Sequence, residues 1–238
     1  MMRNILLSSV VLFFAPVMRA QRLPWVFPGD FRERIRLSDL VVSGIVEENS
    51  EAGTEFVDRI ELIANSAHFR VDRIFQGHCS SELQFKWFRL WSPVGKGMVY
   101  SGPPVANFGT HERYLIFLKK SDKGWVVAMP VYALHAKLAP APTSNAIQDL
   151  SSAPLQARYQ ALAEELETAA LKVQNPPPGM TGEAATYFSA VFDLIGACAE
   201  PFYRHFESSP SRELRDAATE WLGVINRHHA TCVQTPRQ

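Results

Sequence analysis

The sequence predicts an α+β protein whose strands and helices are segregated along the chain, a small β-barrel domain followed by an α-helical bundle domain. Three observations lead to this fold class. Short apolar or alternating segments fill the chain before residue 140, amphipathic helical patterns follow it, and a proline-containing segment, Ala139 to Ser144, lies between them. Period-2 alternation is typical of strands, and apolar positions three and four residues apart are typical of helices. We therefore place the domain boundary near residue 140.

Residues 1–20 have the pattern of a secretory signal peptide. Arg3 gives the positive start, Ile5 to Ala15 the apolar run, and Ala20 the small residue before the cleavage position. The apolar run is too short to cross a membrane, which takes about 20 apolar residues, and no cysteine near the cut offers a lipid anchor. We expect a mature chain that starts near Gln21, is secreted or periplasmic, and has no membrane span.

The first domain, residues 21–140, is predicted to consist of short antiparallel strands. In residues 113–118, Tyr114, Ile116 and Leu118 alternate with Leu115 and Phe117, so one face should fill a core. Five or six such strands favour a small, partly open barrel. The expected strands are 40–46, 68–75, 82–90, 113–118 and 124–131, with a further bulged strand at 55–63.

The second domain, residues 141–238, is predicted to be helical and able to persist independently of the first. A first helix begins after Ser152, carries Leu155, Tyr159, Leu162 and Leu166 on one buried stripe, and leaves Glu165 on its surface. The prolines in Asn175 to Gly179 end it. Further helices are expected at about 182–199, in a short piece through residue 206, and from about 210 to 228.

Three segments of the first domain carry a resemblance to a known family. SDLVVSGIV at 38–46, FRVDRIFQG at 69–77 and GTHERYLIFLKK at 109–120 resemble bacterial members of the netrin and tissue-inhibitor-of-metalloproteinase family over residues 36–132. The resemblance implies an OB-like five-stranded barrel. Animal inhibitors of that family clamp a protease zinc through an N-terminal cysteine, whereas no cysteine precedes Cys79 here, so this activity is not expected. Residues 213–223 weakly resemble half of a HEAT-type helical pair, without a second copy.

Charge and motifs exclude several functional classes. The full chain has 24 basic and 24 acidic residues, and loss of Arg3 and Arg19 with the signal peptide leaves a slightly acidic protein, so nucleic acid is not an expected partner. No hydrolase or phosphate-binding motif occurs, and a catalytic residue is not assigned. Cys79 is interpreted as a small hydrophobe, not as a nucleophile.

The C-terminal cysteines and histidines leave two interpretations open. Cys198, His205, His228, His229 and Cys232 lack the paired short spacings of a zinc site, so neither a metal nor another cofactor is predicted. Export favours a disulfide between Cys198 and Cys232. The bond needs a chain turn at Pro201 to bring the two residues together, and two free thiols are an equal alternative.

One ligand-binding surface is predicted, at the end of the 82–90 strand and in the loop that follows. Its candidate residues are Lys86, Arg89, Trp91 and Tyr100, which combine positive charge with aromatic rings beside a long glycine- and proline-rich loop. They would hold a protein, peptide or glycan partner. The alternative is that Trp87 belongs to the core and the loop only connects strands.

The function predicted from these patterns is that of an exported, non-enzymatic binding or scaffolding protein of the cell envelope. The alternative from another class is an envelope hydrolase. Its site would lie between the two domains and would use His111, His135 or the C-terminal histidines.

Overall fold

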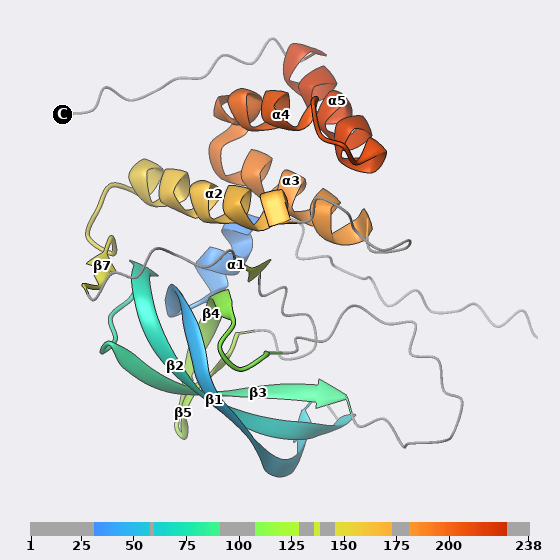
Figure 1. Cartoon of the computed structure of the whole chain (residues 1–238). Coiled ribbons are helices and arrows are strands. Elements are labelled where there is room, and N and C mark those ends of the chain that lie inside the picture. Colours follow the sequence, from blue (N-terminus) through green and yellow to red (C-terminus); the bar gives the residue numbers. More distant parts are fainter. Residues whose placement is uncertain are drawn as a thin grey trace, which may run out of the picture.

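The computed structural model describes residues 31–57, 60–90, 108–128, 136–138, 146–172 and 181–227 (Figure 1). It is an α+β protein in which strands come first and most helices follow. The helices are α1 (Phe31–Leu37), α2 (Leu155–Lys172), α3 (Thr181–Ile195), a 3-10 turn (Gly196–Ala199), α4 (Glu200–Phe206) and α5 (Arg212–Arg227). The strands are β1 (Leu40–Val57), β2 (Ile60–Gln76), β3 (Glu82–Leu90), β4 (Arg113–Ser121), β5 (Gly124–Val127), β6 (Ala136–Lys137) and β7 (Gln148–Asp149).

The described strands form one sheet in the order β1-β2-β3-β5-β4-β6, and β7 pairs with β2. β1 and β2 form a long antiparallel hairpin, β2 pairs antiparallel with β3, and β3 runs parallel to β5. β4 pairs antiparallel with β5 and also with the first part of β1, where Leu40 lies opposite Leu118. Four register shifts interrupt the β1–β2 pairing, and such bulges bend and twist a strand. The sheet is therefore strongly curved (Figure 1).

The inner face of the sheet has its own apolar core, which we call the sheet core. Tyr114, Ile116 and Leu118 of β4 contribute to it, as the alternation in the sequence predicts. Rings pack in it edge to face, with Phe85 and Trp87 each about 5 Å from Phe108 between ring centroids (5.3 and 5.2 Å). Its remaining members come from β1, β2, β3 and β5.

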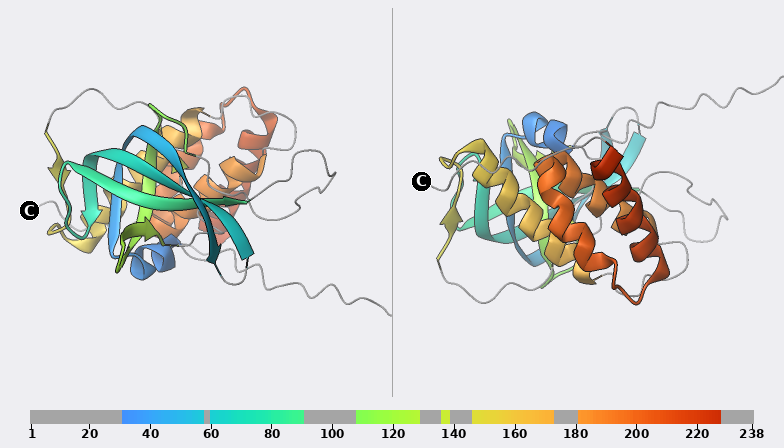
Figure 2. Two further views of the ribbon diagram at one scale, coloured as in Figure 1. Left: turned by 90° about the horizontal axis from the view of Figure 1, so that it is seen from below. Right: turned by 90° about the horizontal axis from the view of Figure 1, so that it is seen from above.

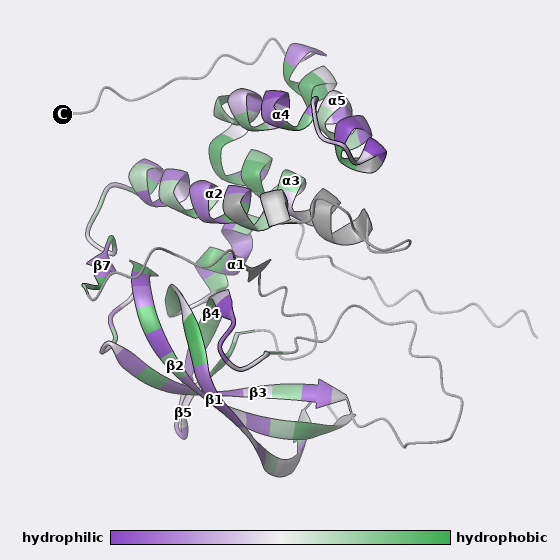
Figure 3. Cartoon of the chain, in the orientation of Figure 1, coloured by the Kyte–Doolittle hydropathy of each residue, from purple (hydrophilic) through white to green (hydrophobic). Residues whose placement is uncertain are grey.

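A second core joins the sheet to the helices, and we call it the shared core. Leu115 and Phe117 point away from the sheet core into this one, together with Val41 and Phe75. Figure 2 shows that the helices lie on one side of the sheet, and Figure 3 shows apolar and polar residues alternating along the strands. The helices contribute, among others, Leu162, Leu166, Phe188, Val191, Leu194, Phe202, Tyr203, Phe206, Leu214, Ala218, Leu222 and Ile225.

Several predicted elements differ from the observed ones. The single strand expected at 55–63 is wrong, because β1 ends at Val57 and β2 begins at Ile60. α1 was not expected. Leu155, predicted to be buried, is 50% exposed, and Glu165, predicted to be on the surface, is 3% exposed. The predicted linker at 139–144 and the end of the 124–131 strand lie outside the described residues. No helix in the described part of the chain is long and apolar enough to cross a membrane.

Candidate binding site

Two of the four predicted ligand-binding residues lie on β3, and both are already paired with carboxylates of β1. The Lys86 ammonium contacts Glu55, and the Arg89 guanidinium contacts Glu51. Trp91 and Tyr100 lie outside the described residues. Trp87 is buried in the sheet core, and its Nε1 donates a hydrogen bond to Asn49 Oδ1 at 3.0 Å. Trp87 is thus a packing residue, as the alternative interpretation of this segment holds.

The cysteines show no catalytic environment within the described residues. Cys79 is a free, partly buried thiol, and its burial, helped by the negative charge of Asp149, raises its pKa to about 11. A thiol in this state is almost entirely protonated at neutral pH and is a poor nucleophile. Cys198 is disulfide-bonded. Cys232, its predicted partner, lies outside the described residues, so that pairing stays a prediction.

The histidines of the alternative hydrolase are only partly described. His111 is exposed on the turn before β4, where its backbone has a left-handed φ of 63° and its amide N donates to Val46 O at 2.7 Å. His205 is exposed on α4. His135, His228 and His229 lie outside the described residues. Within the described ranges, no three His, Cys, Asp or Glu side chains gather closely enough to hold a metal ion.

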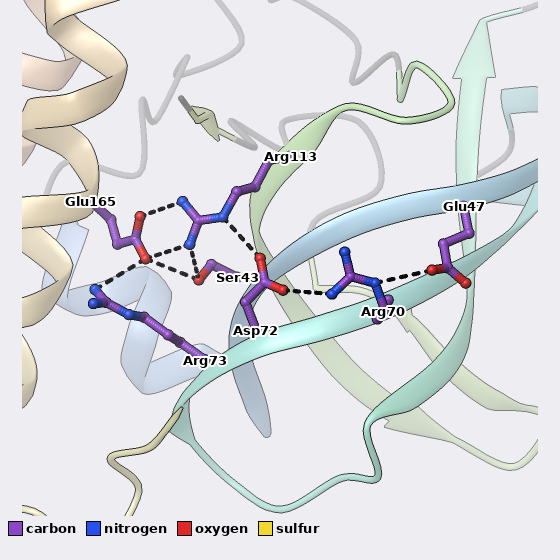
Figure 4. A network of polar contacts seen from close by, with 7 residues as sticks. All are labelled: Ser43, Glu47, Arg70, Asp72, Arg73, Arg113 and Glu165. Carbon is purple, nitrogen blue, oxygen red and sulfur yellow. Dashed lines mark hydrogen bonds and ion pairs between the residues drawn. The ribbon is translucent and has the colours of Figure 1, made fainter. Parts of the chain in front are cut away.

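A buried ionic network connects the sheet to α2 (Figure 4). At its centre, Arg113 of β4 donates to both carboxylate oxygens of Glu165 on α2, with distances of 2.6 Å from Nη1 and 2.7 Å from Nη2. The Ser43 hydroxyl of β1 donates to Glu165 Oε1 at 3.1 Å. Both ionic side chains are almost fully buried. This two-point geometry is the strongest form of an arginine–carboxylate pair.

The network continues along β2 toward the surface. Asp72 accepts a hydrogen bond from Arg113 Nε at 3.0 Å, and its other oxygen contacts Arg70, which also binds Glu47. Arg73 reaches Glu165 at 3.2 Å. Burial lowers the pKa of Arg113, but the hydrogen bonds and charges of Glu165 and Asp72 outweigh it, so the pKa is raised overall. The network therefore holds α2 in a fixed position on β2 and β4.

Sequence patterns contain a signal for this network. Arg113 is on the same face of β4 as Leu115 and Phe117, the two apolar residues that follow it on that face. Glu165 directly precedes Leu166 on α2 and is close to the buried stripe. A single charge on the buried face of a strand and a second on the border of a buried helix stripe together suggest a pair.

A cleft of about 390 Å³ opens where α1, the end of β2 and the start of α2 meet. Arg32 stacks over the Tyr159 ring at 5.5 Å from the centroid, and its Nη2 donates to Leu194 O at 3.2 Å. Gln76 donates to two carbonyls, that of Ile35 on α1 and that of Ser38 just after α1. Among the described residues, the cleft is lined by Arg32, Glu33, Ile35, Arg36, Gln76, Leu155 and Tyr159.

The chemistry of the cleft suits an amphipathic ligand. Leu155 presents a half-exposed apolar side chain to the cleft. Two guanidinium groups, a phenol, an amide and the carboxylate of Glu33, which is paired with Arg36, surround it. Its volume is within the range of about 300–1,000 Å³ that is typical of ligand sites in proteins.

Comparison with known proteins gives no relatives: no protein-family model, curated protein or solved structure matches the chain.

Proposed function

We propose that this chain is an exported, non-enzymatic binding or scaffolding protein of the cell envelope. The observation that carries the proposal is the cleft between α1, β2 and α2, which joins an apolar wall to basic and hydrogen-bonding groups. Its ligand is a protein, peptide or glycan segment with an apolar group that contacts Leu155. A hydrogen-bonding or anionic part of the ligand would face Arg32 and Tyr159.

We also propose that the sheet is an OB-like barrel related to the netrin and tissue-inhibitor-of-metalloproteinase family. The pairings support this, because they lead from β1 through β2, β3, β5 and β4 back to β1. Closure of a sheet into a barrel would remove the edges of the strands that close it. The helices then form a bundle that covers one outer side of the barrel.

Export is supported by the pattern of residues 1–20. The disulfide-bonded state of Cys198 is a second, independent support, because disulfides persist in oxidising compartments and are rare in the cytosol. N-terminal sequencing of the protein recovered from its native envelope tests this part. A chain that still began at Met1 would contradict it.

A paired substitution tests the cleft. Leu155→Ser removes the apolar wall of the cleft, and Phe56→Ser removes a similarly exposed apolar side chain at the far end of the β1–β2 hairpin. Peptide and glycan arrays would first identify ligands of the wild type, and calorimetry would then measure their Kd. We expect Leu155→Ser to weaken binding at least tenfold, and Phe56→Ser to leave it unchanged.

If Phe56→Ser weakened binding and Leu155→Ser left it unchanged, the ligand would bind at the hairpin and not at the cleft. Equal binding by all three proteins would show that the cleft does not bind the ligand. Circular dichroism should show that both variants are folded, because each substitution replaces an exposed side chain.

A further inference from the structure

Helix α1 carries a buried arginine whose guanidinium Nε lacks a hydrogen-bond partner among the described residues. Arg34 is only 6% exposed, and its Nε has no hydrogen-bond partner in the part of the chain that the structure describes. Its guanidinium carbon is 5.9 Å from the centroid of the Phe31 ring. By contrast, Arg113, which is equally buried, has carboxylates on two sides. Buried polar groups are nearly always paired, so Arg34 calls for an explanation.

One charged neighbour influences Arg34. Burial lowers its pKa to about 10, and the negative charge of Asp193 on α3 opposes that shift. Asp193 uses Oδ2 to accept a hydrogen bond from Phe31 N at 3.3 Å. Arginine stays protonated at any physiological pH, so a positive charge remains in this desolvated position.

We propose that Arg34 binds the carboxylate group of a small ligand at the junction of α1 and α3. A guanidinium presents its donors as a planar fork that matches a carboxylate in two-point geometry. A single negative charge fits best, because Asp193 already reduces the local positive charge and would repel a second. A phosphate dianion is therefore a poorer ligand than a carboxylate.

This site is separate from the cleft described above. Arg32 and Arg36 line the cleft, and Arg34 does not. With 3.6 residues per turn, a residue two positions away projects from nearly the opposite side of a helix. The proposal therefore does not depend on ligand binding at the cleft, and either one can fail alone.

Acetate is the probe for the experiment, with chloride at the same ionic strength as the reference. In nitrogen-edited NMR spectra of the purified wild type, the Arg34 Nε–H signal should shift and saturate as acetate is added. The signal is assigned by its loss in Arg34→Lys. Thermal melts of the same samples should show a saturable rise in Tm with acetate. Phosphate should bind at least tenfold more weakly than acetate.

Two variants give the matched comparison. Arg34→Met should lose the acetate-dependent rise in Tm, and Arg212→Met, on α5 with an exposed side chain paired to Asp216, should keep it. The proposal is overturned if the wild-type Arg34 signal does not respond to acetate or if Arg34→Met keeps the response. Tighter binding of phosphate than acetate would overturn the carboxylate assignment. Because the NMR measurement uses the wild type, it decides the matter even if Arg34→Met does not fold.

Discussion

At the scale of single residues, Arg113 and Glu165 show that a charged side chain can be buried when an oppositely charged partner is in contact with it. Each loses nearly all contact with water, and each is compensated by the other and by Ser43, Asp72 or Arg73. A pair of this kind adds little when compared with two well-packed apolar residues, but removing one member leaves an unpaired buried charge. The network should therefore matter most when it is broken on one side.

Glu165→Ala should lower the free energy of unfolding by about 3–5 kcal/mol, because it leaves Arg113 buried without its main counterion. The double variant Arg113→Met/Glu165→Leu should be closer to the wild type, since no buried charge remains. Urea denaturation measures both. Glu164→Ala is the matched control, because Glu164 is the adjacent exposed residue on α2 and should change stability by less than about 0.5 kcal/mol. Equal effects of Glu165→Ala and Glu164→Ala would show that the network does not support the fold.

The thiol of Cys79 should react slowly at ordinary pH. Its pKa is raised from 9.0 to about 11, so most of the thiol is protonated below pH 11. At pH 8 the fraction present as the reactive thiolate is about 100-fold lower than for a thiol of pKa 9. The rate of alkylation by iodoacetamide should rise with pH through a midpoint near 11 in the folded protein. The same protein in urea should show a midpoint near 9. A folded-state midpoint near 9 would mean that the thiol is fully solvated.

Some residue environments can be read from the sequence and others cannot. The alternation in β4 predicts the two faces of that strand, and burial confirms it. Leu155 fits the apolar stripe of α2 but is half exposed, because it lies in the first turn, where the cleft separates it from α1. The sequence marks Arg113 and Glu165 as charged residues beside apolar faces, but it does not show that the two lie opposite each other in the fold. Pairing across such a separation is a tertiary property that local periodicity does not contain.

At the scale of elements, the predicted bounds are best where apolar residues alternate clearly. β3 occupies the predicted residues 82–90, and α2 the predicted range to within about two residues. β1 extends to Val57, although the sequence has a strand pattern only at residues 40–46. The second half of β1 is exposed on both faces, so it has no apolar periodicity that would predict a strand. α1 was missed because seven residues with three arginines give no clear stripe.

α1 should nevertheless contribute strongly to stability. Phe31 packs edge to face on Phe117 of β4, with ring centroids 5.3 Å apart, and both rings belong to the shared core. Phe31→Ala should cost about 3–5 kcal/mol of unfolding free energy, as expected for removal of a buried ring. Arg36→Ala on the exposed side of the same helix should cost less than about 1 kcal/mol. Similar urea midpoints for the two variants would show that α1 is not part of the cooperative core.

At the scale of the whole molecule, the sequence places a domain boundary at residues 139–144, and the packing crosses it. Val41, Phe75, Leu115 and Phe117 come from strands before the boundary and share one core with α2 and α3, which follow it. The Arg113–Glu165 pair also crosses it. The helices would expose a large apolar surface without the sheet. From this packing we predict that the sheet and the helices unfold together, whereas the sequence alone predicts that the helical part persists independently.

Leu118→Asp tests whether the molecule unfolds as one unit. Leu118 is fully buried in the sheet core, and an unpaired carboxylate there should unfold the sheet. Since the strands form one wall of the shared core, the helices should lose their packing at the same time. Hydrogen exchange should then be fast in α3 and α5 as well as in β1 and β4, and the helical circular dichroism signal should fall.

The matched control is Lys119→Asp, which introduces the same carboxylate one position further along β4, on an exposed side chain. It should stay folded, with slow exchange throughout the strands and helices. If Leu118→Asp exposes the strand amides while the amides of α3 and α5 stay protected, the two parts fold separately despite their common core. In that case the boundary predicted at residues 139–144 divides the protein energetically as well as by composition, and the shared core contributes less than its burial implies.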